Sequence, residues 1–211
     1  MKRIIFITEN ANKFRELQAY IKNHVNVNVS GNLGIVLEML KPDTEIHEIQ
    51  SLNREEIVIH KLHDALRACE YLLSMNHEPS VETWVLVEDT SLCISKLGGF
   101  PGPFIKFFLE SMSLDRIGHD YWGAEAQSYV NLAIGRLMQN EHMQHGISFI
   151  KTFNGMVNGH IVDARGTHGF GFDPIFRPIS SDKTNAEMSQ EEKAGFNPRI
   201  LAFQKVLEYL V

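Results

Sequence analysis

Short apolar runs and amphipathic segments alternate along the first part of the chain. Arg3–Thr8 and Thr83–Val87 are dominated by apolar residues, which predicts strands buried on both faces. Lys13–Ile21 and Glu55–Met75 carry apolar residues at every third or fourth position, which predicts helices, and Ile200–Leu210 repeats that pattern near the end. Strands that alternate with helices indicate an α/β fold.

The second part of the chain adds a further helical pattern and a predicted hairpin. Ala124–Met138 has apolar residues at helical spacing. Ile147–Val157 and His160–Ala164 read as strands, and they flank Asn158-Gly159, a dipeptide that favours a tight hairpin turn. A hairpin that follows alternating elements predicts a mixed central sheet with flanking helices rather than a purely parallel sheet.

Composition and charge are those of an ordinary globular protein that lacks a nucleic-acid-binding surface. The 211 residues are 44% hydrophobic, and no repeat or linker interrupts them, so one domain over residues 1–211 is expected. The net charge of −6 argues against general nucleic-acid binding, which needs a basic surface. No apolar run is long enough for a signal peptide or a membrane span. Cys69 and Cys93 lie in core-like segments, which predicts buried thiols in a reducing compartment and hence a cytoplasmic protein.

Two adjacent carboxylates follow the strand pattern of Thr83–Val87. Glu88 and Asp89 precede a loop of small residues, and Lys106 comes shortly after that loop. Hard cations such as Mg²⁺ prefer one or two carboxylates together with phosphate oxygens and water, so this segment predicts a magnesium site. The alternative is a solvated turn between strand and loop.

A possible anion site lies where the first strand hands over to a helix. Thr8, Asn10 and Lys13 place a hydroxyl, an amide and an ammonium group near a helix N-terminus, which favours anions. The chain has no P-loop motif, so phosphate binding here would use different geometry. The alternative is simple helix capping by Asn10 or Asn12.

A glycine-dense loop between Gly166 and Phe176 could bring backbone close to a planar ligand, with Phe170 or Phe172 stacked on it. The alternative is an irregular loop whose phenylalanines belong to the core. Lys193 and Arg199 follow just before the last helix.

Taken together, these dispersed motifs resemble the inosine triphosphate pyrophosphatase family, which hydrolyses deaminated purine nucleoside triphosphates to monophosphate and pyrophosphate. The resemblance extends over nearly the whole chain, from Thr8 to Arg199. It rests on Thr8–Glu16, Glu48–Gln50, Glu88–Leu92, Gly98–Lys106, Gly169–Phe176, Ala186–Ser189 and Glu192-Lys193. It implies an elongated two-lobed structure with the substrate cleft between the lobes, a homodimer, and a Mg²⁺ cofactor.

The resemblance also implies a phosphate-binding set: Thr8, Asn10 and Lys13 would hold the triphosphate, assisted by Lys61 and Lys106. Lys13 would belong to the catalytic group as well.

For the metal, the resemblance implies that Glu48 and Asp89 place Mg²⁺, with Glu88 adjacent. Asp89 would also be the general base that activates water.

At the other end of the nucleotide, the resemblance implies that Phe170, Gly171 and Asp173 flank the base and sugar, while Lys193 and Arg199 close over the base.

Two positions depart from the family pattern. Glu9 places an acid near the expected phosphates, and Asn197-Pro198-Arg199 stands where the family has Ser-His-Arg. Proline has no side-chain donor and no backbone N–H, so the histidine that donates to the 6-oxo group of a deaminated purine is lost. Asn197 remains a good N-cap and Pro198 suits the first helical position.

Two alternatives to the leading function therefore stay open. One is the same reaction on a different nucleotide, because of Pro198. The other is a non-catalytic nucleotide-binding protein, which retention of Glu48, Asp89, Lys13 and Lys193 disfavours.

Overall fold

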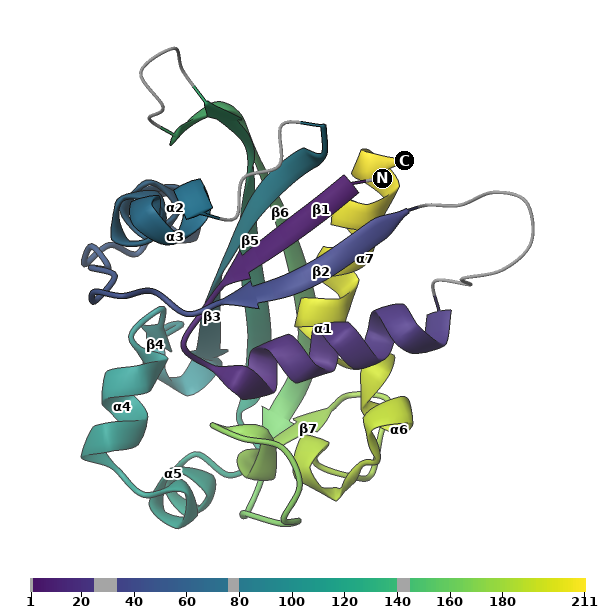
Figure 1. The fold of residues 1–211 in the computed structure, drawn as a ribbon. Coiled ribbons are helices and arrows are strands. Elements are labelled where there is room, and N and C mark those ends of the chain that lie inside the picture. Colours follow the sequence, from purple (N-terminus) through teal and green to yellow (C-terminus); the bar gives the residue numbers. More distant parts are fainter. Residues whose placement is uncertain (1, 25–33, 76–79, 140–144) are drawn as a thin grey trace. The chain divides into compact units, whose positions relative to one another are not determined.

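The computed structural model describes residues 2–24, 34–75, 80–139 and 145–211 (Figure 1). The strands are β1 (Lys2–Ile7), β2 (Ile35–Leu40), β3 (Glu82–Ile94), β4 (Pro101–Gly102), β5 (Glu125–Gln139), β6 (His145–Ile161) and β7 (Phe176–Pro178). The α-helices are α1 (Ala11–His24), α2 (Arg54–Ala68), α3 (Glu70–Met75), α4 (Ile105–Ser111), α5 (Leu114–Asp120), α6 (Gln190–Ala194) and α7 (Pro198–Leu210). Short 3₁₀ turns are η1 (Ser95–Leu97), η2 (Asp173–Ile175) and η3 (Asn185–Glu187).

The strands that the structure describes form one mixed sheet. Its order is β2-β1-β3-β5-β6-β7, and β4 pairs with β3. Strand β1 runs parallel to both neighbours, with Lys2 opposite Ile35 on β2 and Glu82 on β3. Strand β4 is antiparallel to β3, and β7 is antiparallel to β6. The prediction of a mixed α/β sheet with flanking helices is therefore confirmed.

The chain divides into two compact units. Unit 1 comprises residues 1–89, 131–153 and 205–211, and unit 2 comprises residues 90–130 and 154–204. Strands β3, β5 and β6 and helix α7 each contribute residues to both units.

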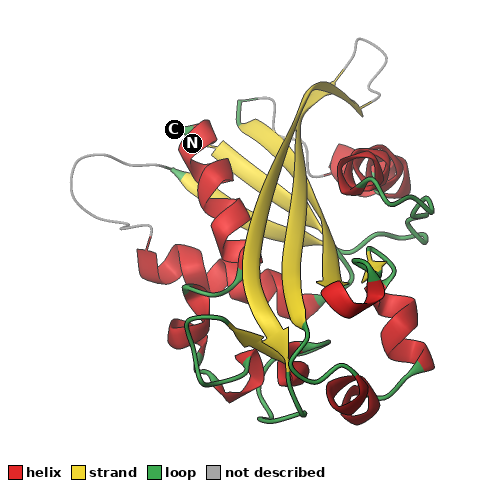
Figure 2. Cartoon of the chain, turned by 180° about the vertical axis from the view of Figure 1, so that it is seen from behind, coloured by secondary structure: helices red, strands yellow, loops and turns green. Residues whose placement is uncertain are grey.

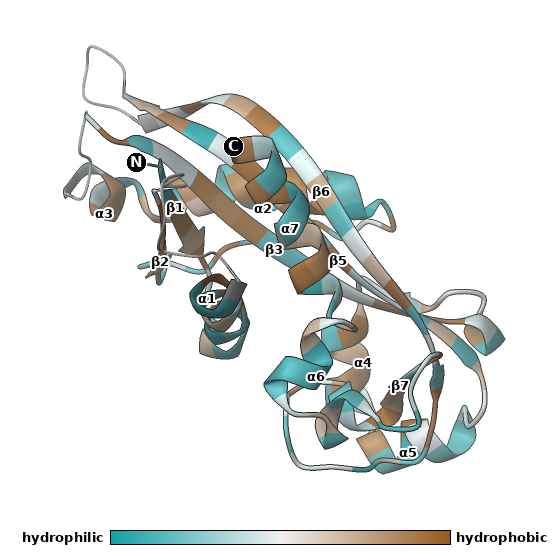
Figure 3. Ribbon diagram, turned by 90° about the vertical axis from the view of Figure 1, so that its right-hand side faces the viewer, coloured by the Kyte–Doolittle hydropathy of each residue, from teal (hydrophilic) through white to brown (hydrophobic). Residues whose placement is uncertain are grey.

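The core of unit 1 is built on alternate residues of the central strands. Ile5 and Ile7 of β1 and Val85 and Val87 of β3 pack with one face of α2, which contributes Val58, Leu62, Ala65 and Leu66. Because successive side chains of a strand point to opposite faces, Ile4, Phe6, Trp84 and Leu86 are buried on the other side of the sheet. Residues 4–7 of β1 and 84–87 of β3 are accordingly apolar and buried on both faces of the sheet, in keeping with the brown stretches of these two strands in Figure 3.

Unit 2 has a separate core. It is formed by the end of β3, by α4 and α5, and by the segment that leads into β7. Its fully buried members include Leu92, Ile94, Ile117, Ile175 and Phe176.

The predicted helix over Ala124–Met138 is wrong, because this segment is strand β5 (a long yellow strand in Figure 2). Its apolar residues fit two periods at once. Ala124, Ala126, Ser128 and Val130 are buried in strict alternation, and residues 130–135 are then buried on both faces. A strand buried on both faces cannot be told from a buried helix by periodicity alone.

The predicted hairpin turn at Asn158-Gly159 is also wrong, because β6 runs through both residues without turning. Gly159 pairs with Pro178 of β7. A Cβ atom on Gly159 would lie 2.5 Å from the Arg177 carbonyl oxygen and 2.6 Å from the Phe176 ring. The glycine therefore permits a close approach of β7 rather than a tight turn.

Two further boundaries differ from the sequence prediction. Strand β3 does not stop at Val87 but continues to Ile94, so Glu88 and Asp89 lie inside a buried strand rather than in a loop after it. The long predicted helix over Glu55–Met75 is divided at Cys69 into α2 and α3. The helices predicted over Lys13–Ile21 and Ile200–Leu210 are confirmed as α1 and α7.

None of the helices in the described part of the chain is both long and apolar enough to span a bilayer.

Candidate functional site

The turn between β1 and α1 is organised by its own polar side chains. The Asn10 N–H donates to Thr8 Oγ1 at 3.1 Å, and Asn10 Oδ1 accepts from the N–H groups of Asn12 at 2.9 Å and Lys13 at 3.4 Å. Helix capping by Asn10, the alternative drawn from the sequence, is therefore what the structure shows. Capping leaves the Lys13 side chain available for another partner, and Glu9 is exposed.

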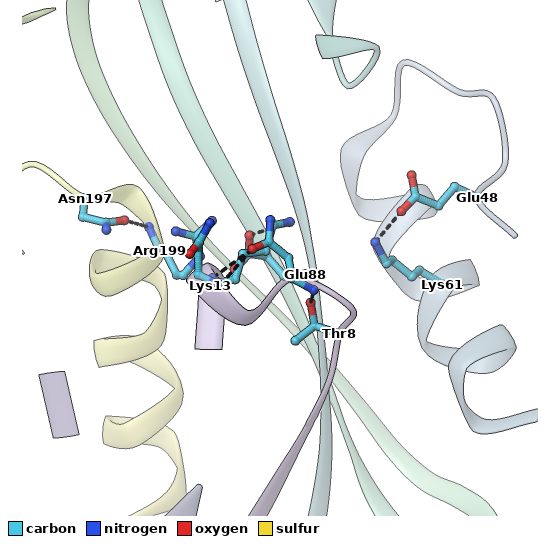
Figure 4. Close-up of polar contacts among 9 residues, drawn as sticks. Thr8, Lys13, Glu48, Lys61, Glu88, Asn197 and Arg199 are labelled. Atoms are coloured by element: carbon cyan, nitrogen blue, oxygen red, sulfur yellow. Dashed lines mark hydrogen bonds and ion pairs between the residues drawn. The ribbon is translucent and has the colours of Figure 1, made fainter. Parts of the chain in front are cut away.

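That partner is Glu88 on β3. Lys13 Nζ lies 3.1 Å from Glu88 Oε1 (Figure 4), and the Glu88 side chain is almost completely buried. Burying a carboxylate without a counter-charge is costly, so this ion pair satisfies Glu88 inside unit 1.

Glu88 and Asp89 are consecutive strand residues, so their side chains leave β3 on opposite faces. Asp89 follows the alternation of Val85 and Val87, which pack against α2, whereas Glu88 pairs with α1. The two carboxylates therefore lie on opposite faces of the sheet. A solvated turn is excluded, because Glu88 is 2% and Asp89 6% exposed.

Burial raises the pKa of Asp89 from 3.8 to about 6. The ammonium groups of Lys61 and Lys13 pull this pKa down, and the carboxylates of Glu48 and Glu88 push it up. A carboxylate with a pKa near the operating pH is suited to general-base catalysis, because it is ionised and still a useful proton acceptor.

Glu48 and Lys61 form a second ion pair in unit 1. Lys61 Nζ on α2 donates to Glu48 Oε1, which lies on the segment that precedes α2 (Figure 4). Lys61 is mostly buried and Glu48 is about half exposed.

Whether these residues suit Mg²⁺ can be judged from the donors. Among the described residues, no group of three or more His, Cys, Asp or Glu side chains is arranged to hold a metal ion. Mg²⁺ does not need such a group, because one or two carboxylates with water and phosphate oxygens suffice. Glu48 and Asp89 supply carboxylate oxygens, which are the donors that Mg²⁺ prefers, so the residue types fit the ion.

In unit 2, Asp173 is the centre of a buried polar cluster. Its Oδ2 atom accepts from Lys193 Nζ at 2.8 Å and from the Phe170 N–H at 2.9 Å. Its Oδ1 atom accepts from Asn185 Nδ2 at 3.4 Å. The carboxylate thus fixes the glycine-dense loop and a lysine in one arrangement.

Phe170 is held in this loop by two cations. Lys193 Nζ lies 5.4 Å and the Arg199 guanidinium 5.5 Å from the centre of its ring, distances at which cations are attracted to aromatic faces. Phe172, in contrast, is buried in the core of unit 2. The core interpretation therefore holds for Phe172, and Phe170 is the residue suited to stack on a planar ligand.

The turn around Phe170 depends on glycine. Gly169 and Gly171 have φ angles of 82° and 63°, a region that other residues rarely adopt. A Cβ atom on Gly169 would also lie 2.2 Å from Asp173 Oδ2.

Asn185 is a residue that sequence reasoning missed. It is 2% exposed, and its Oδ1 atom has no hydrogen-bond donor among the residues that the structure describes. The only sequence signal was its position directly before the motif Ala186–Ser189, where nothing indicates contact with Asp173.

The start of α7 is set by Asn197 and Pro198. Asn197 Oδ1 accepts from the Arg199 N–H at 2.9 Å (Figure 4), as expected for an N-cap with proline at the first helical position. This bond occupies the Arg199 amide, and Pro198 has none to offer. The Arg199 side chain is buried.

The predicted site residues thus fall into two groups. Thr8, Asn10, Lys13, Glu48, Lys61, Glu88 and Asp89 belong to unit 1, whereas Lys106, Phe170, Gly171, Asp173, Lys193 and Arg199 belong to unit 2. Within unit 1 the lysines and carboxylates are brought together as ion pairs. Within unit 2 the aromatic ring, the acid and two cations are brought together, and Lys106 lies exposed in the first turn of α4.

Known proteins are similar to this chain over nearly its whole length. The model of the Ham1 family matches residues 4–209. An inosine triphosphate pyrophosphatase of Batrachochytrium dendrobatidis is 32% identical over 209 residues, covering 99% of this chain and 94% of its own length. One of Puccinia graminis f. sp. tritici is 30% identical over 207 residues, covering 98% and 96%.

Solved structures share the fold at lower identity. A HAM1 protein from Coxiella burnetii is 23% identical, with a TM-score of 0.64 over 100% of this chain and 98% of its own. The Ham1 protein of Staphylococcus aureus is 22% identical, with a TM-score of 0.62 over 99% and 98%.

Proposed function

This chain belongs to the Ham1 family, and we propose from that membership that it hydrolyses non-canonical purine nucleoside triphosphates to monophosphate and pyrophosphate. Its relatives of about the same length are inosine triphosphate pyrophosphatases. The observation that carries the proposal is Asp89, a buried carboxylate with a pKa of about 6, next to two lysines in a position to neutralise phosphate charge.

The triphosphate would be bound by unit 1. Lys13 and Lys61 would neutralise phosphate oxygens, with Lys106 assisting, and Thr8 and Asn10 would shape the start of α1. Phosphoryl transfer of this kind needs positioning and charge neutralisation rather than a covalent nucleophile, which is why lysines and acids suffice.

Asp89 would take a proton from the water that attacks the α-phosphorus, and pyrophosphate would leave with its charge neutralised by Lys13. A base with a pKa of about 6 is largely ionised at neutral pH, so it can accept that proton.

We propose Mg²⁺ as cofactor, held by Glu48 and Asp89. Glu88, which the sequence placed next to the metal, points to the other face of β3 and pairs with Lys13. When bound, the ion would supply charge stabilisation at the phosphate oxygens and would help to orient them.

The purine base would be bound by unit 2. Phe170 would stack on the base, Gly171 would let the backbone approach it, and Asp173 would fix the loop. Lys193 and Arg199 would donate to acceptors of the base.

The choice of base is the finer question, because Pro198 offers no donor. The Arg199 N–H is used by the Asn197 cap, and the side chains of Lys193 and Arg199 lie near Phe170 as donors. Fewer donors favour a weaker preference for 6-oxo purines, and the alternative of a different preferred nucleotide rests on this observation. A hydrogen bond of this kind is worth about 0.5–1.5 kcal/mol.

A panel of nucleotides tests these proposals. The protein should convert inosine and xanthosine triphosphates to monophosphate and pyrophosphate, as resolved by chromatography, and a chelator should abolish the reaction. Diphosphate with orthophosphate as products, or full activity in chelator, would contradict the proposal, and no turnover of any nucleotide would favour the non-catalytic alternative.

The same panel should include Pro198→His and Pro198→Ala. The histidine variant should raise kcat/KM for inosine triphosphate relative to adenosine triphosphate, whereas alanine, which restores only the backbone N–H, should not. An unchanged preference in the histidine variant would show that another group reads the 6-oxo oxygen.

We further propose a cytoplasmic homodimer that does not bind nucleic acid. The acidic net charge supports the last point.

A further inference from the structure

Two of the three lysines expected to bind phosphate are already paired with a carboxylate that was predicted for the metal site. Lys13 pairs with Glu88, and Lys61 pairs with Glu48. The two lysines come from different helices, Lys13 from α1 and Lys61 from α2, so the same kind of pairing occurs twice.

Lys61 also acts on Asp89, since among the neighbouring charges it has the largest effect in lowering that residue's pKa. A single ammonium group therefore stabilises the charge of both carboxylates that would hold Mg²⁺. Glu48, held by Lys61, is not gathered with other acids into a metal-binding group within the described ranges.

We propose that Lys61 serves as a placeholder cation, which neutralises Glu48 and Asp89 until a nucleotide triphosphate draws it away and lets Mg²⁺ take its place. The inference rests on the proposed function, and it deepens that function by adding a rule for how metal and nucleotide bind. Metal and triphosphate should bind cooperatively, and neither should bind well alone.

The charges support this rule. Glu48, Asp89 and Lys61 sum to −1 when Asp89 is ionised, so Mg²⁺ alone would leave this group at +1 and would compete with a lysine that already satisfies Glu48. A triphosphate carries several negative charges, and it gives Lys61 a new partner at the moment when the metal needs Glu48. By linkage, whatever factor the triphosphate adds to metal affinity, the metal adds to triphosphate affinity.

Two variants test metal binding and triphosphate binding separately, and both are followed by ligand binding rather than by turnover. Lys61→Met keeps the length of the side chain but removes its charge, so Glu48 loses its ion pair with Lys61. Mn²⁺ titrated alone into the protein, with bound metal followed by electron paramagnetic resonance and displaced by Mg²⁺, should then bind about tenfold or more tightly than in the wild type, because a hydrogen bond to a charged group is worth roughly that factor.

The matched control is Lys151→Met. Lys151 is an exposed lysine of β6 in unit 1, and its loss makes the same change in net charge. Equal metal affinity in Lys61→Met, Lys151→Met and the wild type would overturn the inference.

The reverse variant is Glu48→Gln, which releases Lys61. Inorganic tripolyphosphate titrated in chelator, followed by calorimetry, should bind this variant more tightly than the wild type. Weaker or unchanged binding would contradict the placeholder role, and this measurement stands by itself if Lys61→Met does not fold.

The placeholder role of Lys61 and the proposed reaction can be contradicted separately. If the wild type releases pyrophosphate from nucleotides but both binding measurements are negative, only the placeholder role is wrong. If both measurements are positive but no nucleotide is hydrolysed, the ion exchange stands and the proposed reaction does not.

Discussion

Asp89 is the residue on which catalysis and stability make opposite demands. Asp89→Asn removes the proposed base and a proposed metal ligand, so kcat should fall by about 10²-fold or more, since a general base alone contributes roughly 10²–10⁴-fold. Steady-state assays at saturating nucleotide and Mg²⁺ measure the change. An active variant would move the base elsewhere, with Glu88 as the first residue to test.

The same variant should stabilise the metal-free protein at high pH. The folded pKa of Asp89, about 6, lies above its ordinary value of 3.8, so ionisation opposes folding. The stability that the neutral acid contributes is fully present below pH 4 and is lost as the pH rises through 6, in all by about 3 kcal/mol. Thermal melts in chelator should show a higher melting temperature for Asp89→Asn than for the wild type at pH 8 but not at pH 4.5. A gain of equal size at both values would contradict the raised pKa.

Much of the candidate site could be predicted residue by residue, but the pairing within it could not. Motif spacing predicted Lys13, Glu88 and Asp89 as site residues, and the structure joins the first two in an ion pair. That Glu88 faces α1 while Asp89 faces α2 depends on β3 continuing through both, which the loop-like sequence after Asp89 concealed. Asn185 was missed because its contact with Asp173 joins residues twelve positions apart through an irregular loop.

At the scale of elements, the wrong predictions for β5 and β6 both result from tertiary contacts that the local sequence does not show. Strand β5 is buried on both faces at its centre, so its sequence lost the alternation that marks a half-exposed strand. In β6, Gly159 is needed because β7 approaches it closely, and not because the backbone of β6 turns there. The helices α1 and α7 were predicted correctly, because each has one exposed face and a polar cap.

The junction between β6 and α7 gives a prediction at this scale. A Cβ atom on Gly155 would lie 1.9 Å from the Pro198 carbonyl oxygen and 2.9 Å from the Ala202 nitrogen. Gly155→Ala must therefore push the first turn of α7 away from β6, at a cost of roughly 1–3 kcal/mol for an overpacked site. Thermal melts measure the loss, and a weaker affinity for the nucleotide should accompany it, because Arg199 lies in that turn.

Gly195→Ala is the matched control. A Cβ atom there meets nothing within 4 Å, and the φ angle of −70° suits alanine. Equal melting temperatures for the two variants would show that the close approach of α7 does not exclude a side chain at position 155.

For the whole molecule, the prediction concerns assembly. The proposed homodimer should give a mass close to twice 24.0 kDa by light scattering at micromolar concentration. A mass of one chain under those conditions would contradict it. The elongated two-lobed shape and the single domain likewise stay predictions, since they came from the family resemblance and from the absence of linkers.

The way the chain is divided has a consequence for its synthesis on the ribosome. Unit 1 begins with β1 but is completed only by residues 205–211, which are translated after all of unit 2. Those late residues are needed, because Val206 and Leu210 are buried, Tyr209 packs edge-on against Trp84, and the Leu210 carbonyl accepts from Lys2. Until the end of α7 has left the ribosome, the apolar strands of the first half therefore lack part of their core. During that time they are exposed to chaperones and to aggregation.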